Sequence, residues 1–136
     1  MKLPPRLAAV VVKDGVSLGL LAEGDRALVL ALAASAIEPG RAHREADVNR
    51  VLESWLAGPG ALLRTDHVEL RRWLVDAGFV SRDGFGRAYV RGEAEAARAT
   101  ALLGEGPAAA LEDAVLTQRA ARAAERASRR QAYTTR

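Results

Sequence analysis

Apolar side chains recur at three- and four-residue spacing in five separate stretches of the chain, a pattern typical of amphipathic helices packed against a core. We therefore predict helices over residues 26–37, 44–57, 66–77, 93–103 and about 107–130. Asp25 is expected to cap the first of them. Asp66 and Glu69 are expected to form a capping box on the third, which Gly78 ends in the left-handed conformation.

Two other stretches have the composition of short strands. Residues 79–91 predict a hairpin with its loop at 83–86, and Phe79 or Val80, together with Tyr89, is expected to reach the core. Residues 7–21 place two β-prone runs around Asp14-Gly15, which favours a second hairpin near the N-terminus. Residues 41–43 are long enough for one extended segment.

From the first helix to the hairpin at 79–91, the predicted order is helix, extended segment, helix, helix, strand, strand. This is the topology of a winged helix-turn-helix. The predicted fold class is mainly α, of the α+β type. A winged helix-turn-helix domain covers residues 25–91, an N-terminal β-hairpin extension covers 1–24, and C-terminal helices with an Arg-rich tail cover 92–136.

Composition narrows the class of protein. Hydrophobic residues fill 49% of the 136 positions but aromatic residues only 4%, so the core must be rich in small side chains. The chain has no cysteine, which excludes disulfides and thiolate metal sites. No apolar run has the length expected of a signal peptide or a membrane span. We therefore expect a soluble, cytoplasmic protein.

Positive charge is concentrated at the C-terminal end. Residues 1–116 carry 14 Lys and Arg against 16 Asp and Glu, a net charge of −2, whereas residues 117–136 carry six Arg against one Glu, a net charge of +5. The tail arginines recur every three or four residues, so a helix would hold them in one stripe. Such a stripe can lie along a phosphate backbone.

Groups that could perform catalysis are not found together in the sequence. His43 and His67 are isolated, and neither has metal-ligand spacing to a carboxylate. No nucleophile motif and no phosphate-binding glycine loop with a lysine is present. We therefore expect no enzymatic activity, no metal and no cofactor.

Two blocks within residues 38–91 carry a family resemblance: EPGRAHREADVNRVL and DHVELRRWLVDAGFVSRDGFGRAYVR. In order and spacing they resemble a bacterial winged-helix family known as domain of unknown function two-zero-eight-seven. Members of that family often stand alone or are fused behind transcriptional regulators of the ArsR type. The resemblance therefore implies a regulatory role linked to nucleic acid, without supplying an activity.

DNA binding, in the manner of a transcriptional regulator, is the leading functional prediction. In a winged helix-turn-helix the third helix enters the major groove and the hairpin reaches neighbouring phosphates. Sequence readout is assigned to His67, Arg71 and Arg72. Phosphate contact is assigned to the arginines of the hairpin and tail: Arg82, Arg87, Arg91, Arg119, Arg122, Arg126, Arg129 and Arg130.

Carboxylates on the third helix weigh against this prediction. Asp66, Glu69 and Asp76 outnumber Arg71 and Arg72, and carboxylates are repelled by phosphates. Two alternatives stay open for this reason. One is a non-catalytic adaptor that binds another protein through this helix, and the other is a protein that binds structured RNA or the ribosome through the Arg-rich helix.

The expected partner is nucleic acid, with DNA preferred over RNA, and no membrane partner is expected. A homodimer through the terminal helices is a further prediction. Its apolar contacts would come from Leu111, Val115 and Leu116.

Overall fold

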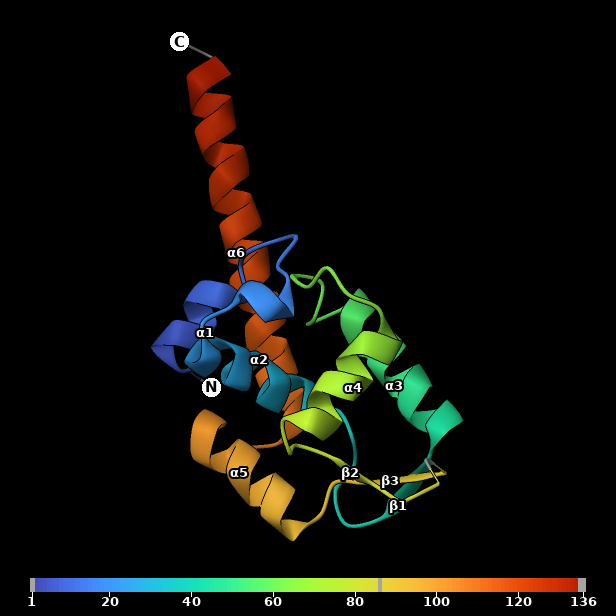
Figure 1. Ribbon diagram of the computed structural model, residues 1–136. Helices are drawn as coiled ribbons and strands as arrows, with labels where there is room; N and C mark the ends of the chain where they lie inside the picture. The colour runs from blue at the N-terminus through green and yellow to red at the C-terminus, as the bar shows by residue number, and fades with distance from the viewer. Residues whose placement is uncertain (1, 86, 135–136) are drawn as a thin grey trace.

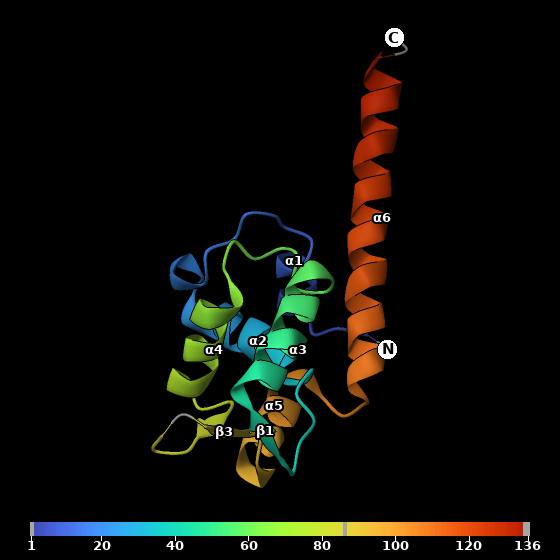
Figure 2. The ribbon, with the colours of Figure 1, turned by 90° about the vertical axis from the view of Figure 1, so that its right-hand side faces the viewer.

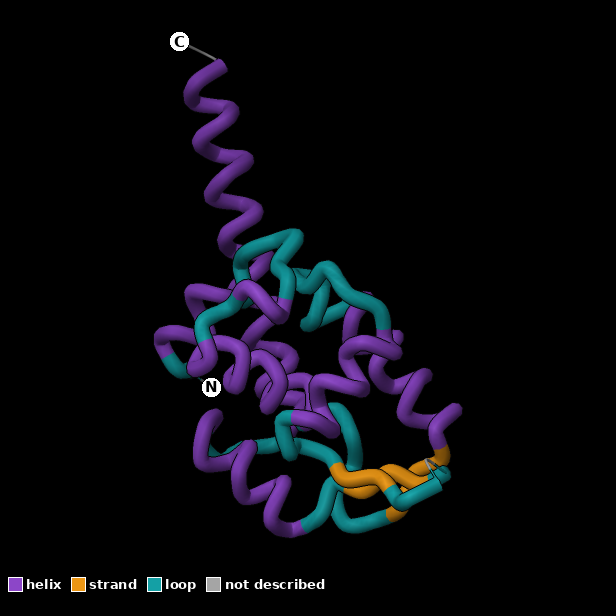
Figure 3. Tube along the Cα trace, in the orientation of Figure 1, coloured by secondary structure: helices purple, strands orange, loops and turns teal. Residues whose placement is uncertain are grey.

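The computed structural model describes residues 2–85 and 87–134. Helices form most of the molecule, and a small sheet lies at one end of it (Figures 1 and 3). In chain order the elements are α1 (Pro5–Val10), the 3-10 helix η1 (Leu18–Leu20), α2 (Glu23–Ala34), β1 (Ala42–Arg44), α3 (Glu45–Ala57), α4 (His67–Asp76), β2 (Ser81–Arg82), β3 (Ala88–Val90), α5 (Glu93–Leu103) and α6 (Ala108–Thr134).

The three strands form one antiparallel sheet in the order β1-β3-β2. Tyr89 on the central strand lies opposite His43 of β1 on one side and Arg82 of β2 on the other. The fold is therefore of mixed α+β class, and the extended segment predicted near residues 41–43 and the hairpin predicted at residues 79–91 are both confirmed. The order helix, strand, helix, helix, strand, strand from α2 to β3 is confirmed as well.

The ends of α4 follow the predicted rules closely. The Asp66 carboxylate accepts a hydrogen bond from the backbone N–H of Glu69 at 2.8 Å, so the predicted N-cap is confirmed. The Glu69 carboxylate does not complete the capping box, because it accepts instead from the hydroxyl of Thr65 at 2.6 Å. Gly78 ends the helix with φ at +79°, a conformation that a side chain disfavours.

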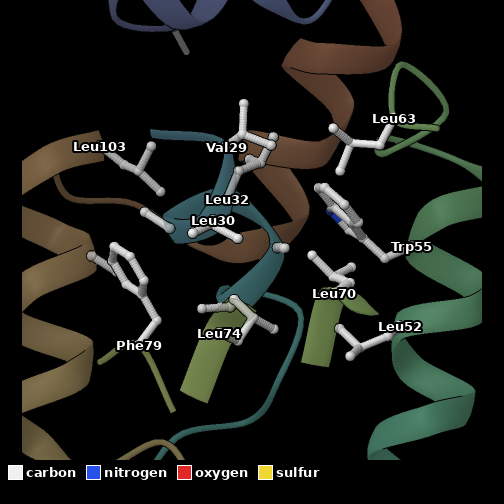
Figure 4. Packing of buried hydrophobic residues seen from close by; sticks show 14 of the residues in the cluster. Val29, Leu30, Leu32, Leu52, Trp55, Leu63, Leu70, Leu74, Phe79 and Leu103 are labelled. Carbon is white, nitrogen blue, oxygen red and sulfur yellow. The ribbon is translucent and has the colours of Figure 1, made fainter. Parts of the chain in front are cut away.

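One apolar cluster holds the helices together (Figure 4). Leu30 and Leu32 of α2 lie between Trp55 of α3 on one side and Phe79, after α4, on the other. Phe79, Val80 and Tyr89 are all buried, as predicted. In the turn after α3, the backbone of Gly60 packs directly against Trp55. A Cβ at this position would lie 2.3 Å from the indole ring, so a side chain does not fit there.

The predicted N-terminal hairpin is wrong. Residues 5–10 form a helix, and Val16 makes its β-bridge with Leu63 in the connection between α3 and α4. Pro5 occupies the first turn, where its fixed φ favours helix and its missing N–H costs nothing. Leu7 and Val10 are buried at helical spacing, a signal that the β-prone composition of the run obscured.

The predicted cap of the first helix is also wrong. Helix α2 begins at Glu23, its N-cap position is Ala22, and no side chain caps it. Asp25 lies inside the first turn and pairs instead with Arg6 of α1, with 2.7 Å between Asp25 Oδ1 and Arg6 Nε. This hydrogen bond holds the pKa of Asp25 below its ordinary value.

Helix α6 packs on the body with its first half and projects from it with its second half (Figures 1 and 2). Leu111 and Val115, two of the three residues predicted to form a dimer contact, are buried within this chain. The third, Leu116, is 44% exposed and remains accessible. From residue 123 to residue 134 every position is exposed. The free half of α6 therefore presents mainly alanine and arginine to solvent.

Candidate nucleic-acid interface

A shallow groove lies between α4 and the β2–β3 hairpin. Its volume is about 320 Å³, and side chains from both elements line it. The lining residues are Arg71, Arg72, Val75, Asp76, Arg82 and Tyr89. The groove thus lies between the two elements, α4 and the hairpin, for which the sequence predicts nucleic-acid contact.

Arg72 and Arg82 are exposed on the two sides of the groove. Within the part of the chain that the structure describes, neither guanidinium has a carboxylate at ion-pair distance. Asp76 lines the same groove and lowers its positive potential. The site can therefore accept an anionic group, but its net charge is small.

The hairpin loop carries an exposed aromatic residue that the sequence reasoning missed. Phe85 is 83% exposed, and the guanidinium of Arg87 lies over its ring at 5.4 Å from the centroid. The Asp83 carboxylate accepts hydrogen bonds from the backbone N–H of Phe85 at 3.1 Å and of Arg87 at 2.8 Å. The available signal was an aromatic residue among the loop-forming residues 83–86.

Arg71, for which the sequence predicts base readout, makes contacts inside the protein. Its guanidinium donates to the side-chain oxygen of Asn49, lies 3.2 Å from a carboxylate oxygen of Glu45, and stacks over the ring of Tyr89 at 5.6 Å. Tyr89 in turn donates from its hydroxyl to Glu45 at 3.2 Å. With only 15% of its side chain exposed, Arg71 joins α4 to α3 and β3.

His67 also has an internal partner. Its Nδ1 lies 3.5 Å from a carboxylate oxygen of Glu53 on α3, and 30% of its side chain is exposed. This places it at the junction of α3 and α4 and away from the groove lining. The structure therefore does not bring His67 together with Arg72 and Arg82.

Arg91, for which the sequence predicts phosphate contact, is buried and does not face outward from the hairpin. Only 8% of the residue is exposed, and its Nη1 donates to the backbone carbonyl of Ile37 at 3.2 Å. Burial lowers its pKa from the ordinary value. Arg91 directly follows β3 and lies against the segment after α2. There its backbone carbonyl accepts a hydrogen bond from the N–H of Gly40.

Arg119, for which the sequence predicts phosphate contact, attaches α6 to the N-terminal segment. Its Nη1 donates to the carbonyls of Val11 at 2.8 Å and Lys13 at 2.9 Å, and its Nη2 lies 2.7 Å from the carboxylate of Asp14. This hydrogen bond holds the pKa of Asp14 below its ordinary value. Arg119 thus supplies donors to carbonyls that follow the last turn of α1.

The remaining tail arginines are more accessible. Glu125 lies 3.5 Å from Arg122 and 2.6 Å from Arg129, while Arg126 lies 3.8 Å from Asp14. These are surface pairs, which contribute little and exchange readily with solvent. Arg130 is exposed near the end of α6. Among the described residues of the free half, arginine therefore stays in excess over carboxylate.

The two basic regions lie at opposite ends of the molecule. The free end of α6 points away from the body, and the sheet and hairpin lie at the far side of the body from it in both views (Figures 1 and 2). One short nucleic acid therefore cannot contact both the pair Arg72 and Arg82 and the arginines near residue 130.

Residues 2–85 and 87–134 contain neither a metal-binding cluster nor a helix that could cross a membrane. No group of three or more His, Asp and Glu side chains there is arranged to hold a metal ion. No helix in this part of the chain combines the length and the apolar character that a membrane crossing requires.

The groove, the sheet and the helices around them define a small mixed α+β domain with a basic helical appendage. The family model described as an uncharacterized protein conserved in bacteria (DUF2087) matches residues 22–91, which is half of the chain and contains α2 through β3. The chain belongs to this family. No curated protein and no solved structure matches it.

Proposed function

We propose that the protein binds nucleic acid, duplex DNA in preference to RNA, as a winged-helix transcriptional regulator. The observation that carries the proposal is the arrangement of α2 to β3. Its element order and its sheet order β1-β3-β2 support a winged helix-turn-helix, in which α4 would be the recognition helix. A helix of this kind fits the major groove of B-form DNA, whereas the major groove of A-form RNA is too narrow for it.

The contacts in this proposal come from Arg72 on α4 and from Arg82 and Arg87 on the hairpin. All three are exposed, and Arg72 and Arg82 line the same groove. Phe85 at the hairpin loop adds an accessible ring that can stack on a base or a sugar. Three phosphate contacts correspond to a fall in log Kobs of about 2.7 for each tenfold rise in salt.

The exposed face of α4 sets a limit on specificity. Glu69 and Asp76 lie on the same side as Arg72, one turn before it and one turn after it. Their carboxylates oppose close approach to phosphates, so binding depends mainly on the hairpin and on one arginine of the helix. We therefore expect moderate affinity with little discrimination between sequences.

The free half of α6 is a second contact in the proposal. Arg126, Arg129 and Arg130 lie within one helical turn of each other and bind phosphates without reading bases. Because this end lies far from the hairpin (Figure 2), the two contacts act independently on nucleic acid.

Fluorescence anisotropy with labelled random duplex DNA and with structured RNA, at two salt concentrations, tests the proposal. Arg72→Ala and Arg82→Ala should each weaken DNA binding and lower the salt slope by about 0.9. Lys2→Ala removes the same charge from an exposed position outside the groove and is the matched control. A version ending at Ala124 keeps the Arg119 contacts and removes the free end of α6.

Each result has a defined meaning. Loss of binding in Arg72→Ala and Arg82→Ala but not in Lys2→Ala supports the groove. Binding that disappears only in the version ending at Ala124 contradicts it and assigns nucleic-acid contact to α6. Equal or tighter binding of structured RNA contradicts the preference for duplex DNA.

One observation favours a second candidate, an adaptor that binds another protein. The exposed positions Glu69, Arg72 and Asp76 alternate in charge along α4, and half-buried Val75 lies beside them. Such a mixed face suits the charged rim and partly apolar centre of a protein interface. If neither nucleic acid binds at either salt concentration, the adaptor becomes the better account of this face.

A further inference from the structure

A second pocket lies where α5, the start of α6 and the segment after α2 meet. Its volume is about 330 Å³, at the lower end of the range for sites that hold small molecules, roughly 300–1,000 Å³. Ala99 and Leu103 of α5 and Leu111 of α6 supply apolar wall. Ser35 and Thr100 supply hydroxyl groups.

Arg91 lines this pocket, and it is a buried cation that lacks a counter-ion. Only 8% of the residue is exposed, and no carboxylate within the described residues pairs with its guanidinium. A guanidinium stays protonated at neutral pH and has five N–H donors. The Ile37 carbonyl accepts one hydrogen bond from Nη1, and Nε is buried without a partner.

An unpaired charge held away from water is costly, and proteins normally match such a charge with an opposite one. No carboxylate of the described neighbouring helices pairs with Arg91, although Glu93 and Glu95 lie in the first turn of α5. An anion that enters the pocket would supply the missing partner. The rest of the ligand would meet the alanine and leucine side chains of the wall.

We infer that this pocket binds a small organic carboxylate, whose anionic end pairs with Arg91 and whose apolar part lies against Ala99, Leu103 and Leu111. A planar guanidinium and a carboxylate match each other in two parallel hydrogen bonds. A phosphate dianion fits less well, because it needs several donors and Arg91 is the one cation among the described lining residues. The Ser35 hydroxyl already donates to the Ala31 carbonyl at 2.9 Å.

This inference is independent of the proposed nucleic-acid contact. None of the residues that line this pocket lines the groove between α4 and the hairpin. The two proposals can therefore fail or succeed separately.

The experiment is an NMR titration of the full chain with benzoate, at constant ionic strength maintained with sodium chloride. Benzamide, which has the same ring without the charge, and inorganic phosphate are titrated in parallel. Benzoate should cause saturable shifts in amides of α5, of the start of α6 and around residue 35. Benzamide should bind at least about tenfold more weakly, because a charge-assisted hydrogen bond is lost.

Three variants separate the pocket from general effects. Arg91→Met keeps a long side chain without the charge and should abolish binding while the protein stays folded, because a buried unpaired charge is exchanged for an apolar group. Ala96→Leu fills the pocket and should also abolish binding. Ala97→Leu makes the same change on the exposed side of α5 and should leave binding unchanged.

The inference is overturned by any of three results. The first is no saturable response to benzoate in the wild-type protein. The second is equal binding of benzoate and benzamide, or retained binding in Arg91→Met, since either result removes the guanidinium from recognition. The third is tighter binding of inorganic phosphate than of benzoate, which assigns the pocket to a different class of anion.

Discussion

Arg71 and Arg72 are adjacent in sequence, yet the structure gives them opposite roles, and this difference can be measured without any ligand. Replacing Arg71 with alanine removes its hydrogen bond to Asn49, its ion pair with Glu45 and its stacking over Tyr89. Charge-assisted hydrogen bonds contribute about 1.5–3 kcal/mol, and an exposed cation–π contact about 0.5–1 kcal/mol. Because Arg71 is largely buried, we expect Arg71→Ala to lower the free energy of unfolding by about 2–4 kcal/mol.

Arg72→Ala is the matched control, since an exposed arginine without an ion-pair partner among the described residues should change stability by no more than about 0.5 kcal/mol. Urea denaturation followed by circular dichroism measures both values. In a thermal melt the Arg71 variant should lose roughly 8–16 °C, at roughly 4 °C for each kcal/mol in a domain of this size. Equal stability of the two variants would refute the assignment of Arg71 to the interior.

Three further predictions concern the same framework. Gly78→Ala should lower the free energy of unfolding by about 1–2 kcal/mol in urea denaturation, because φ at +79° disfavours a side chain; an unchanged midpoint would count against this conformation. Arg119→Ala should speed amide hydrogen exchange throughout α6, because three hydrogen bonds to residues 11–14 are lost; exchange unchanged outside the mutated position would contradict this role. Asp25, whose pKa is lowered by the hydrogen bond from Arg6, should stabilise the fold fully above its unfolded pKa near 3.8, and this contribution should be lost as pH falls through the lower folded pKa. Acid titrations of wild type and Arg6→Ala should therefore converge at low pH, and a constant difference between them would show that the pair is not the cause.

Sequence reasoning located the elements of the central domain well because their signals are local. The capping aspartate at position 66, the glycine at 78 and the spacing of Leu70 and Leu74 all act within one or two helical turns. The same reasoning failed at residues 7–21, where a short apolar run satisfies helix and strand patterns equally. The deciding contact there is tertiary, since Val16 pairs with Leu63 across 47 positions of the chain.

The candidate site was harder to predict because an arginine is free or occupied according to partners that lie far away in sequence. Arg71 finds its partner Asn49 22 positions away, Arg91 reaches Ile37 across 54, and Arg119 reaches Val11 across 108. No local pattern distinguishes these residues from Arg72 or Arg82. Composition could count the cations, but only the packing of α3, α4 and α6 separates those that are exposed from those that hold the fold together.

The most direct test of the proposed function is to map the DNA contact by NMR, with a short random duplex added to the isotope-labelled full chain. The account predicts shifts in amides of β2 and β3, of the loop between them and of the exposed side of α4 around Arg72, with the amides around the buried Arg91 pocket unchanged. Shifts confined to the free half of α6, with no shifts in the hairpin, would contradict the proposed function.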